Sequence, residues 1–204
     1  LTVTSADENG GSGLASTTCT IDAAATTCGD ALASLADGSH TYVATATDNA
    51  GNSASASFTW LIDTVNPTVS LSDTPDAETT STAADFTVTS ADASSGLAST
   101  TCDLDGTAQA NCGGVVSGLA DGSHTFTATA TDDAGNSASA SHTWLVDTTD
   151  PAVSVTGPAD PTNSQSADFT VTSSDSGSGL SSTTCTLDSV EQADCDEELA
   201  GLAE

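Results

Sequence analysis

The sequence repeats itself with a period of about 83 residues, and this self-similarity limits the fold more than any other feature. Cys19, Cys102 and Cys185 stand 83 positions apart, and a second cysteine follows each of them. The stretch at 35–40 returns with the same six residues at 119–124. A period of this length suits one small domain, so 204 residues amount to about two and a half tandem units.

Both ends of the chain fall inside a unit. Residues 1–5 match 86–90, and 201–203 match 118–120. We therefore expect a segment of a longer tandem array. The alternative, in which neighbouring subunits supply the missing strands, fits less well, because the two partial units overlap in content instead of complementing each other. The expected units are repeat 1 at 1–65, without its N-terminal strand, a complete repeat 2 at 66–149, and repeat 3 at 150–204, without its C-terminal part.

Apolar and polar residues alternate along short stretches, which is the pattern of half-buried β-strands. Phe126, Ala128 and Ala130 fall on one side of such a stretch, and threonines fall on the other. No stretch of useful length has helical periodicity. Turn-forming Gly, Asp, Asn and Ser separate the stretches. The pattern predicts an all-β protein made of tandem Ig-like antiparallel β-sandwich repeats.

The two tryptophans, Trp60 and Trp144, fall on the inward sides of their predicted strands and are expected in the core. His142 is replaced by Phe58 in the preceding unit, which indicates a packing position.

The charge excludes several classes of function. The chain has 29 acidic residues and no Lys or Arg, so its formal net charge is −29. Without cationic side chains it has no means to bind nucleic acid or anionic lipid, and it lacks the Lys or Arg that phosphoryl transfer needs. No apolar run approaches the roughly 18 residues of a membrane helix, so we expect no membrane insertion in this segment. Such a surface attracts cations.

A set of short motifs recurs in order in repeats 1 and 2, and its first part recurs in repeat 3. In repeat 2 these are Cys102 to Cys112, Asp121-Gly122-x-His124, the acidic loop 132–136, and Trp144-x-Val146-Asp147. Together they resemble the bacterial Ig-like repeats of large surface and secreted proteins. The resemblance implies an extracellular, non-catalytic repeat of adhesins, stalks and filaments. The absence of Lys and Arg departs from an average member and points to a saline or calcium-rich setting, or to a lineage with an acidic bias.

The six cysteines form three pairs, one in each unit, with nine or ten positions between partners. This spacing does not fit a zinc site. We expect local disulfides that bridge a hairpin and hence an oxidising compartment outside the cytosol, the alternative being buried thiols. The pairs are Cys19 with Cys28, Cys102 with Cys112, and Cys185 with Cys195.

Acidic and amide side chains stand where one unit is expected to meet the next. Ca²⁺ prefers several hard oxygen ligands, and Ig topology brings the end of one unit near two loops of the following one. The alternative is that these residues only cap their own turns by side-chain hydrogen bonds. We predict Ca²⁺ ligands at two joints, Asp63, Asp92, Asp132 and Asn136 at the first, and Asp147, Asp150 and Asp175 at the second, where the late loop of repeat 3 is missing from the sequence.

The stretch Asp121-Gly122-Ser123-His124 contains the residue types of a hydrolase triad. Neighbours along a strand point to opposite faces, however, so Ser123 and His124 are expected to diverge. The motif also recurs at 37–40, as expected of a scaffold. We predict no enzyme activity and no cofactor other than Ca²⁺.

The functional prediction is a structural extracellular array that forms the stalk or filament body of a cell-surface protein and contacts further repeats of its own chain. The first alternative is an adhesive module that recognises glycan or another cell surface. The second is a non-catalytic accessory region of a secreted hydrolase. An unpaired edge strand would also permit self-assembly into filaments, provided that cations screen the negative charge.

Overall fold

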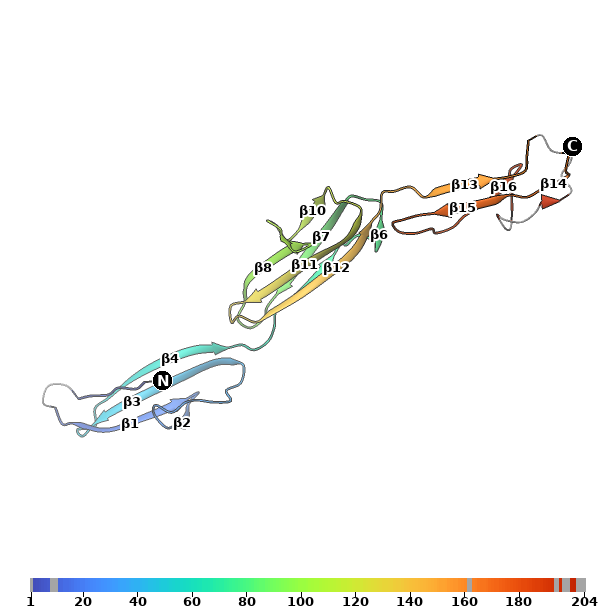
Figure 1. The fold of residues 1–204 in the computed structure, drawn as a ribbon. Coiled ribbons are helices and arrows are strands. Elements are labelled where there is room, and N and C mark those ends of the chain that lie inside the picture. The colour runs from blue at the N-terminus through green and yellow to red at the C-terminus, as the bar shows by residue number, and fades with distance from the viewer. Residues whose placement is uncertain (1, 8–10, 161–162, 193–194, 196–198, 201–204) are drawn as a thin grey trace. The chain divides into compact units, whose positions relative to one another are not determined.

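The computed structural model describes residues 2–7, 11–160, 163–192, 195 and 199–200, and the regular elements among them are β-strands (Figure 1). The predicted all-β class is therefore confirmed. Within this described part of the chain, no helix is long and apolar enough to cross a membrane. Residues 1 and 201–203, which align in sequence with 86 and 118–120, lie outside this described part, as does residue 204.

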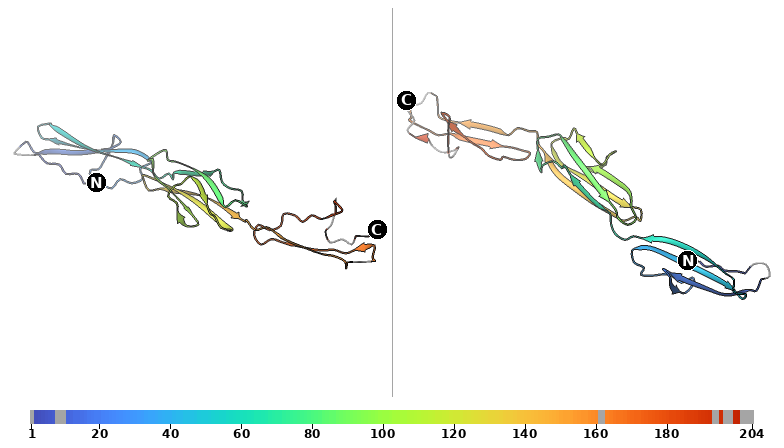
Figure 2. Two further views of the ribbon diagram at one scale, coloured as in Figure 1. Left: turned by 90° about the horizontal axis from the view of Figure 1, so that it is seen from above. Right: turned by 180° about the vertical axis from the view of Figure 1, so that it is seen from behind.

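The first strands form one antiparallel sheet in the order β2-β1-β3-β4, shown from three sides in blue to cyan in Figures 1 and 2. β3 and β4 pair with each other in unbroken register, from Gly38 opposite Ile62 to Thr47 opposite Ser53. Outward Thr and Ser side chains bond across this pair, as Thr41 does with Thr59 at 3.0 Å. The strands are β1 (Leu14–Ile21), β2 (Ala24–Thr26), β3 (Gly38–Asp48) and β4 (Ser53–Ile62).

Two further sheets follow in the expected repeat 2. One has three strands in the order β10-β7-β5, and the other has five in the order β6-β12-β11-β8-β9. The short β6 runs parallel to the end of β12, with Glu78 opposite Leu145. The strands are β5 (Thr68–Ser72), β6 (Glu78–Thr79), β7 (Ala83–Ala91), β8 (Leu97–Leu104), β9 (Thr107–Ala108), β10 (Gly114–Ser117), β11 (Gly122–Asp132) and β12 (Ser137–Val146).

Aromatic rings fill the space between these two sheets. Phe86 on β7 stacks on Phe126 of β11 with ring centroids 4.1 Å apart, and Trp144 of β12 lies 5.4 Å from Phe86. All three side chains are fully buried, as are Ala128 and Ala130. The alternation predicted for 126–130 and the core position of Trp144 are thus confirmed.

The sheet of β1–β4 is covered less completely. Tyr42 is buried, but Phe58 is 62% exposed and Trp60 is only half-buried. The sequence aligns residues 2–7 with the second half of β7, and these residues contain no assigned strand. The expectation that Phe58 marks a buried packing position is therefore wrong in this structure, because residues 2–6, which line an open pocket with Phe58, form no strand that would cover it.

The last part of the described chain contains three pairs of short strands. The pair β13-β15 aligns Val155 with Val171, and its apolar residues remain largely exposed, Val153 at 67% and Val155 at 61%. The strands are β13 (Ala152–Thr156), β14 (Ser166–Ala167), β15 (Thr170–Ser174), β16 (Thr186–Leu187), β17 (Val190–Glu191) and β18 (Leu199–Ala200), with β14 paired to β18 and β16 to β17.

The chain forms two compact units. One comprises 1–69, 89–100 and 129–139, and the other comprises 70–88, 101–128 and 140–204. Each of the two predicted sets of Ca²⁺ ligands described below lies inside a single compact unit. The boundaries predicted for the three repeats, at 65/66 and 149/150, remain a prediction.

The structure joins the cysteines in the three expected pairs. The Cα–Cα distances are 5.2 Å for Cys19–Cys28, 5.2 Å for Cys102–Cys112 and 5.4 Å for Cys185–Cys195. Cys19 lies in β1 and Cys102 in β8, while Cys185 directly precedes β16. Each partner cysteine follows the next short strand, so every bridge closes a local hairpin.

Candidate metal centre

Three aspartates at the ends of strands meet in the first compact unit. Asp63 directly follows β4, Asp92 directly follows β7, and Asp132 is the last residue of β11. The alternation along β11 that buries Phe126 and Ala130 also turns Asp132 inward, and its side chain is only 1% exposed. The strand pattern itself therefore places a carboxylate in the interior.

One carboxylate oxygen from each of Asp63, Asp92 and Asp132 lies within 4.8 Å of the other two. Asp63 is 8% exposed and Asp92 is half-buried, so solvent screens the set poorly. No Lys or Arg exists in the chain to compensate the charge. Three hard oxygens at this separation are the donor type that Ca²⁺ takes.

Asp63 also serves as a local hydrogen-bond acceptor. Its Oδ1 accepts from the Val65 amide at 3.0 Å, and its Oδ2 accepts from the Ser95 amide at 3.0 Å and the Ser95 hydroxyl at 2.5 Å. These bonds, with that from the Ser95 hydroxyl the largest cause, hold the pKa of Asp63 below its usual value. The carboxylate is thus kept ionised.

The Asp92 carboxylate caps its own turn. Its Oδ1 accepts from the amides of Ser94 at 3.0 Å and Gly96 at 2.8 Å. Gly96 has φ +90, a conformation that glycine adopts without strain. The turn-capping interpretation therefore holds for Oδ1, and the role of Asp92 as a Ca²⁺ ligand remains a prediction for a side chain that stands in the acidic cluster.

Asn136 acts as a donor in this structure. Its amide nitrogen donates to Asp132 Oδ2 at 2.8 Å and to the Asp63 carbonyl at 3.0 Å, and its backbone amide donates to Asp132 Oδ1 at 2.8 Å. Asn136 therefore orients Asp132 and ties it to the segment after β4. As a ligand in its own right it remains a prediction.

The second predicted set repeats only part of this arrangement. Asp147 directly follows β12, and its Oδ2 accepts from the Ser178 amide at 2.6 Å and hydroxyl at 2.8 Å. These bonds, the backbone one first, lower the pKa of Asp147. Asp175 directly follows β15 and caps the turn to Gly179 at 2.7 Å, while Asp150 is exposed. Asp147, Asp150 and Asp175 line one open pocket, but within the described residues their carboxylates do not converge as the first three do.

Sequence reasoning missed the two serines that bond Asp63 and Asp147. Ser95 and Ser178 occupy the same place in consecutive units, each followed by Gly-Leu, and Ser12 stands in that place in the first unit. This recurrence was a usable signal. Its meaning was hidden because the partner carboxylates lie 32 and 31 residues earlier in the chain.

Ser123 and His124, both among the described residues, form no hydrogen bond with each other. His124 bonds Asp105 and the Ala120 carbonyl, and Ser123 on the adjacent position is exposed. The divergence expected of strand neighbours is therefore present.

Comparison with known proteins gives a family match for the first part of the chain. Residues 1–64 match the family model of the bacterial Ig-like domain. Among solved structures, the fibronectin(III)-like modules of Clostridium thermocellum CbhA are 18% identical with a TM-score of 0.38, over 71% of this chain and 82% of theirs. A tetra-tandem repeat in the extending region of a large adhesion protein is 22% identical with a TM-score of 0.31, over 91% of this chain and 58% of that one. No curated protein sequence matches the chain. The resemblance to bacterial Ig-like repeats that the sequence motifs indicated is thereby confirmed, with the family match carried by residues 1–64.

Proposed function

We propose that this chain is part of a structural, extracellular Ig-like array, the stalk or filament body of a cell-surface protein, and that Ca²⁺ stiffens it where one repeat follows another. The family match of residues 1–64 supports the array, and the three disulfides suit an oxidising compartment. A chain of such domains projects or connects other parts of a protein and transforms no substrate.

One observation carries the calcium part of the proposal. Asp63, Asp92 and Asp132 hold their oxygens within 4.8 Å of one another in a largely buried place, and the chain has no basic residue to balance them. Like charges at such a distance destabilise one another unless a cation joins them. Asp63 and Asp132 would provide buried ligands and Asp92 the more accessible one. Bound Ca²⁺ would supply positive charge and fix three strand ends together.

The test is calcium binding by calorimetry on the whole chain, with Asp92→Asn as the diagnostic variant. Asparagine retains an oxygen to accept from Ser94 and Gly96, so the turn persists while one charge is lost. Asp85→Asn is the matched control, because Asp85 is exposed on β7 and stands outside the cluster. We expect heat of binding in the parent and in the control, and strongly weakened binding in Asp92→Asn. Absence of binding to the parent at millimolar Ca²⁺ rules the proposal out.

Electron microscopy of the purified protein with and without a chelator tests the filament part. Regular filaments that loosen when Ca²⁺ is removed support a cation-stiffened polymer. Separate, flexible particles under both conditions leave a stalk or linker and discard the polymer.

A second candidate function, adhesion to glycan, has one supporting observation. Phe58 is 62% exposed and stacks beside Trp60 with ring centroids 6.0 Å apart, which presents an aromatic face. Aromatic faces pack well against sugar rings. Glycan-array binding that Phe58→Ala abolishes would favour adhesion over a purely structural role.

A further inference from the structure

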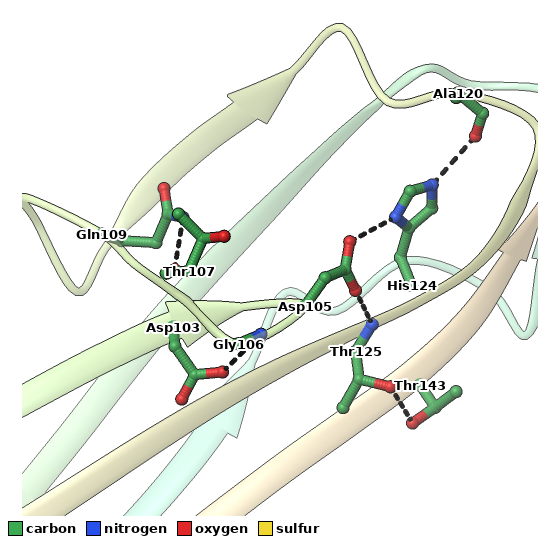
Figure 3. A network of polar contacts seen from close by, with 9 residues as sticks. All are labelled: Asp103, Asp105, Gly106, Thr107, Gln109, Ala120, His124, Thr125 and Thr143. Atoms are coloured by element: carbon green, nitrogen blue, oxygen red, sulfur yellow. Dashed lines mark hydrogen bonds and ion pairs between the residues drawn. The ribbon is translucent and has the colours of Figure 1, made fainter.

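Two histidines of this chain are each held by two oxygen atoms. His124, on β11, lies with its ring 5.7 Å from that of Trp144. Its Nδ1 is 2.8 Å from Asp105 Oδ2, and its Nε2 is 2.9 Å from the Ala120 carbonyl oxygen (Figure 3). Both ring nitrogens are therefore engaged at hydrogen-bond distance.

The same arrangement occurs 84 residues earlier. His40 Nδ1 is 2.7 Å from Asp22 Oδ2, and its Nε2 is 2.7 Å from the Ala36 carbonyl oxygen. Its ring lies 5.8 Å from that of Trp60. Asp22 and Asp105 adopt nearly the same left-handed backbone, at φ +47 and +52. Because two repeats build it alike, the geometry belongs to the fold and not to one turn.

The number of protons that each histidine ring needs to bond both oxygens determines its charge. A carbonyl oxygen has no proton to donate, and a neutral imidazole has only one N–H. The second oxygen of Asp105 accepts from the Thr125 amide at 2.8 Å, as that of Asp22 does from Thr41, which favours the ionised carboxylate. A neutral ring would leave a nitrogen lone pair facing an oxygen within 3 Å. Only the doubly protonated imidazolium satisfies both partners.

The titration shifts agree with this count. The bond to the Ala120 carbonyl, followed by that to Asp105, raises the pKa of His124, and the bond from His124 lowers the pKa of Asp105. In the earlier repeat, the bond to Ala36 and then that to Asp22 raise the pKa of His40.

The bond to the carbonyl closes the turn that leads into the strand, and this turn holds a later segment. In the turn 120–124, Asp121 accepts from the amide and hydroxyl of Thr148, at 3.0 and 2.7 Å, and from the Thr149 hydroxyl at 2.9 Å. Asp37 in the turn 36–40 likewise accepts from the Thr64 hydroxyl at 2.9 Å. Thr64 and Thr148 are the second residues after β4 and β12. Each histidine thus stabilises a turn, and that turn holds the segment after the following strand through hydrogen bonds to its threonines.

The charged groups around each ring are acidic. Asp105 contacts His124, Asp121 lies in the same turn, and Asp103 on β8 is directed to the Gly106 amide at 3.2 Å (Figure 3). Around His40 the corresponding groups are Asp22 and Asp37, and the face supplied by β4 is Trp60. No Lys or Arg in the chain competes for these carboxylates.

We propose that His40 and His124 are pH-sensitive latches. In the protonated form each ring donates to both oxygens and closes its turn, which fastens Thr64 or Thr148. Loss of one proton removes one of the two bonds, opens the turn and loosens the segment after the strand. This device acts on the linker segments and requires no metal ion, so it is independent of the calcium proposal.

The direct test is a titration of the imidazole nitrogens by two-bond ¹H–¹⁵N correlation in the labelled, disulfide-intact chain. Near neutral pH we expect both nitrogens of His40 and His124 to carry protons, with midpoints above that of histidine in the same chain unfolded in urea. A single protonated nitrogen at pH 7, or midpoints equal to the unfolded value, overturns the proposal.

The two repeats provide matched controls for each other. Asp105→Asn is expected to lower the midpoint of His124 and leave His40 unchanged, and Asp22→Asn is expected to do the converse. His142→Phe, which copies the natural Phe58, should change neither midpoint. Equal effects of one Asp variant on both histidines would contradict the assignment of the pairs.

A second readout reports on the segment after the strand. Amide-exchange protection of Thr148, corrected for intrinsic pH dependence, should fall about tenfold as the pH passes the His124 midpoint, the effect of losing one hydrogen bond. In His124→Gln it should be low at every pH. The Leu145 amide within β12, which donates to the Ala77 carbonyl, serves as the internal reference. Protection of Thr148 that stays constant across the midpoint rules out the latch.

Discussion

Asp63 accepts hydrogen bonds from both the backbone amide and the hydroxyl of Ser95, 32 residues further along the chain. Asp147 and Ser178 repeat this relationship with 31 residues between them. In each case the aspartate directly follows a long strand of one predicted repeat, and the serine lies in the turn after a strand of the next predicted repeat. The pair connects the end of one predicted repeat to a loop of the following one.

Ser95→Ala should lower the stability of the protein more than Ser94→Ala. Ser95 donates its hydroxyl to a buried carboxylate, whereas Ser94 donates only its backbone amide to Asp92, which alanine retains. Urea unfolding followed by tryptophan fluorescence measures the difference. Equal midpoints for the two variants would show that the hydroxyl of Ser95 contributes nothing.

Calcium should reverse the stability order of the parent and Asp92→Asn. In chelator the variant should unfold at the same temperature as the parent or a higher one, because one of three close negative charges is gone. With Ca²⁺ at 100 times its dissociation constant, the parent should gain about 2.7 kcal/mol and the variant should gain little. Thermal unfolding with EDTA and with Ca²⁺ provides the comparison. A melting temperature of the parent that is the same with EDTA and with Ca²⁺ would refute the expectation.

Stability should fall on the acid side of about pH 4. The folded-state pKa values of Asp22, Asp63, Asp105, Asp121 and Asp147 are lowered below the ordinary value of 3.8, by hydrogen bonds to the ionised form. For such groups the stabilising contribution is fully present above 3.8 and is lost as the pH falls through the lowered pKa. Urea midpoints between pH 6 and pH 2 measure it. A midpoint that rises on acidification would contradict the sign.

Phe86→Ala should cost about 3–5 kcal/mol of unfolding free energy, because it removes a ring at the centre of the core. Phe86 is 1% exposed and stacks on Phe126 at 4.1 Å. Phe58→Ala, at a side chain 62% exposed, should cost well under half as much. Guanidinium unfolding of both variants tests the contrast. Similar costs would mean that Phe58 is covered in solution.

Replacing Cys102 and Cys112 together by serine should lower stability by about 2.5 kcal/mol, the chain-entropy effect of opening a loop of this length. Both cysteines lie in the best-covered repeat, and their bridge closes ten positions. Denaturant unfolding compares the variant with the oxidised parent, and the reduced parent provides the control. An unchanged midpoint would show that the hairpin holds without the bridge.

The sequence alone determined the strand pattern and the cysteine pairing. Alternation along 126–130 predicted which side chains are buried, because residues two apart share a face in any extended chain. Cysteines nine or ten positions apart can meet through a single hairpin, so their pairing was also a local matter. The same alternation extends to Asp132, although its burial among carboxylates was not evident from the pattern.

Only the tertiary structure decided which polar groups meet. His124 was interpreted as part of a scaffold turn, and its partner Asp105 lies 19 positions away on the far side of a loop. Ser95 was missed because it lies 32 residues after Asp63, in the turn after β7, and β7 belongs to a different sheet from β4. Local patterns depend on the backbone period of each strand, whereas these contacts depend on how several strands stack and where each one ends. That information is shared among distant residues, so no single motif in the sequence contains it.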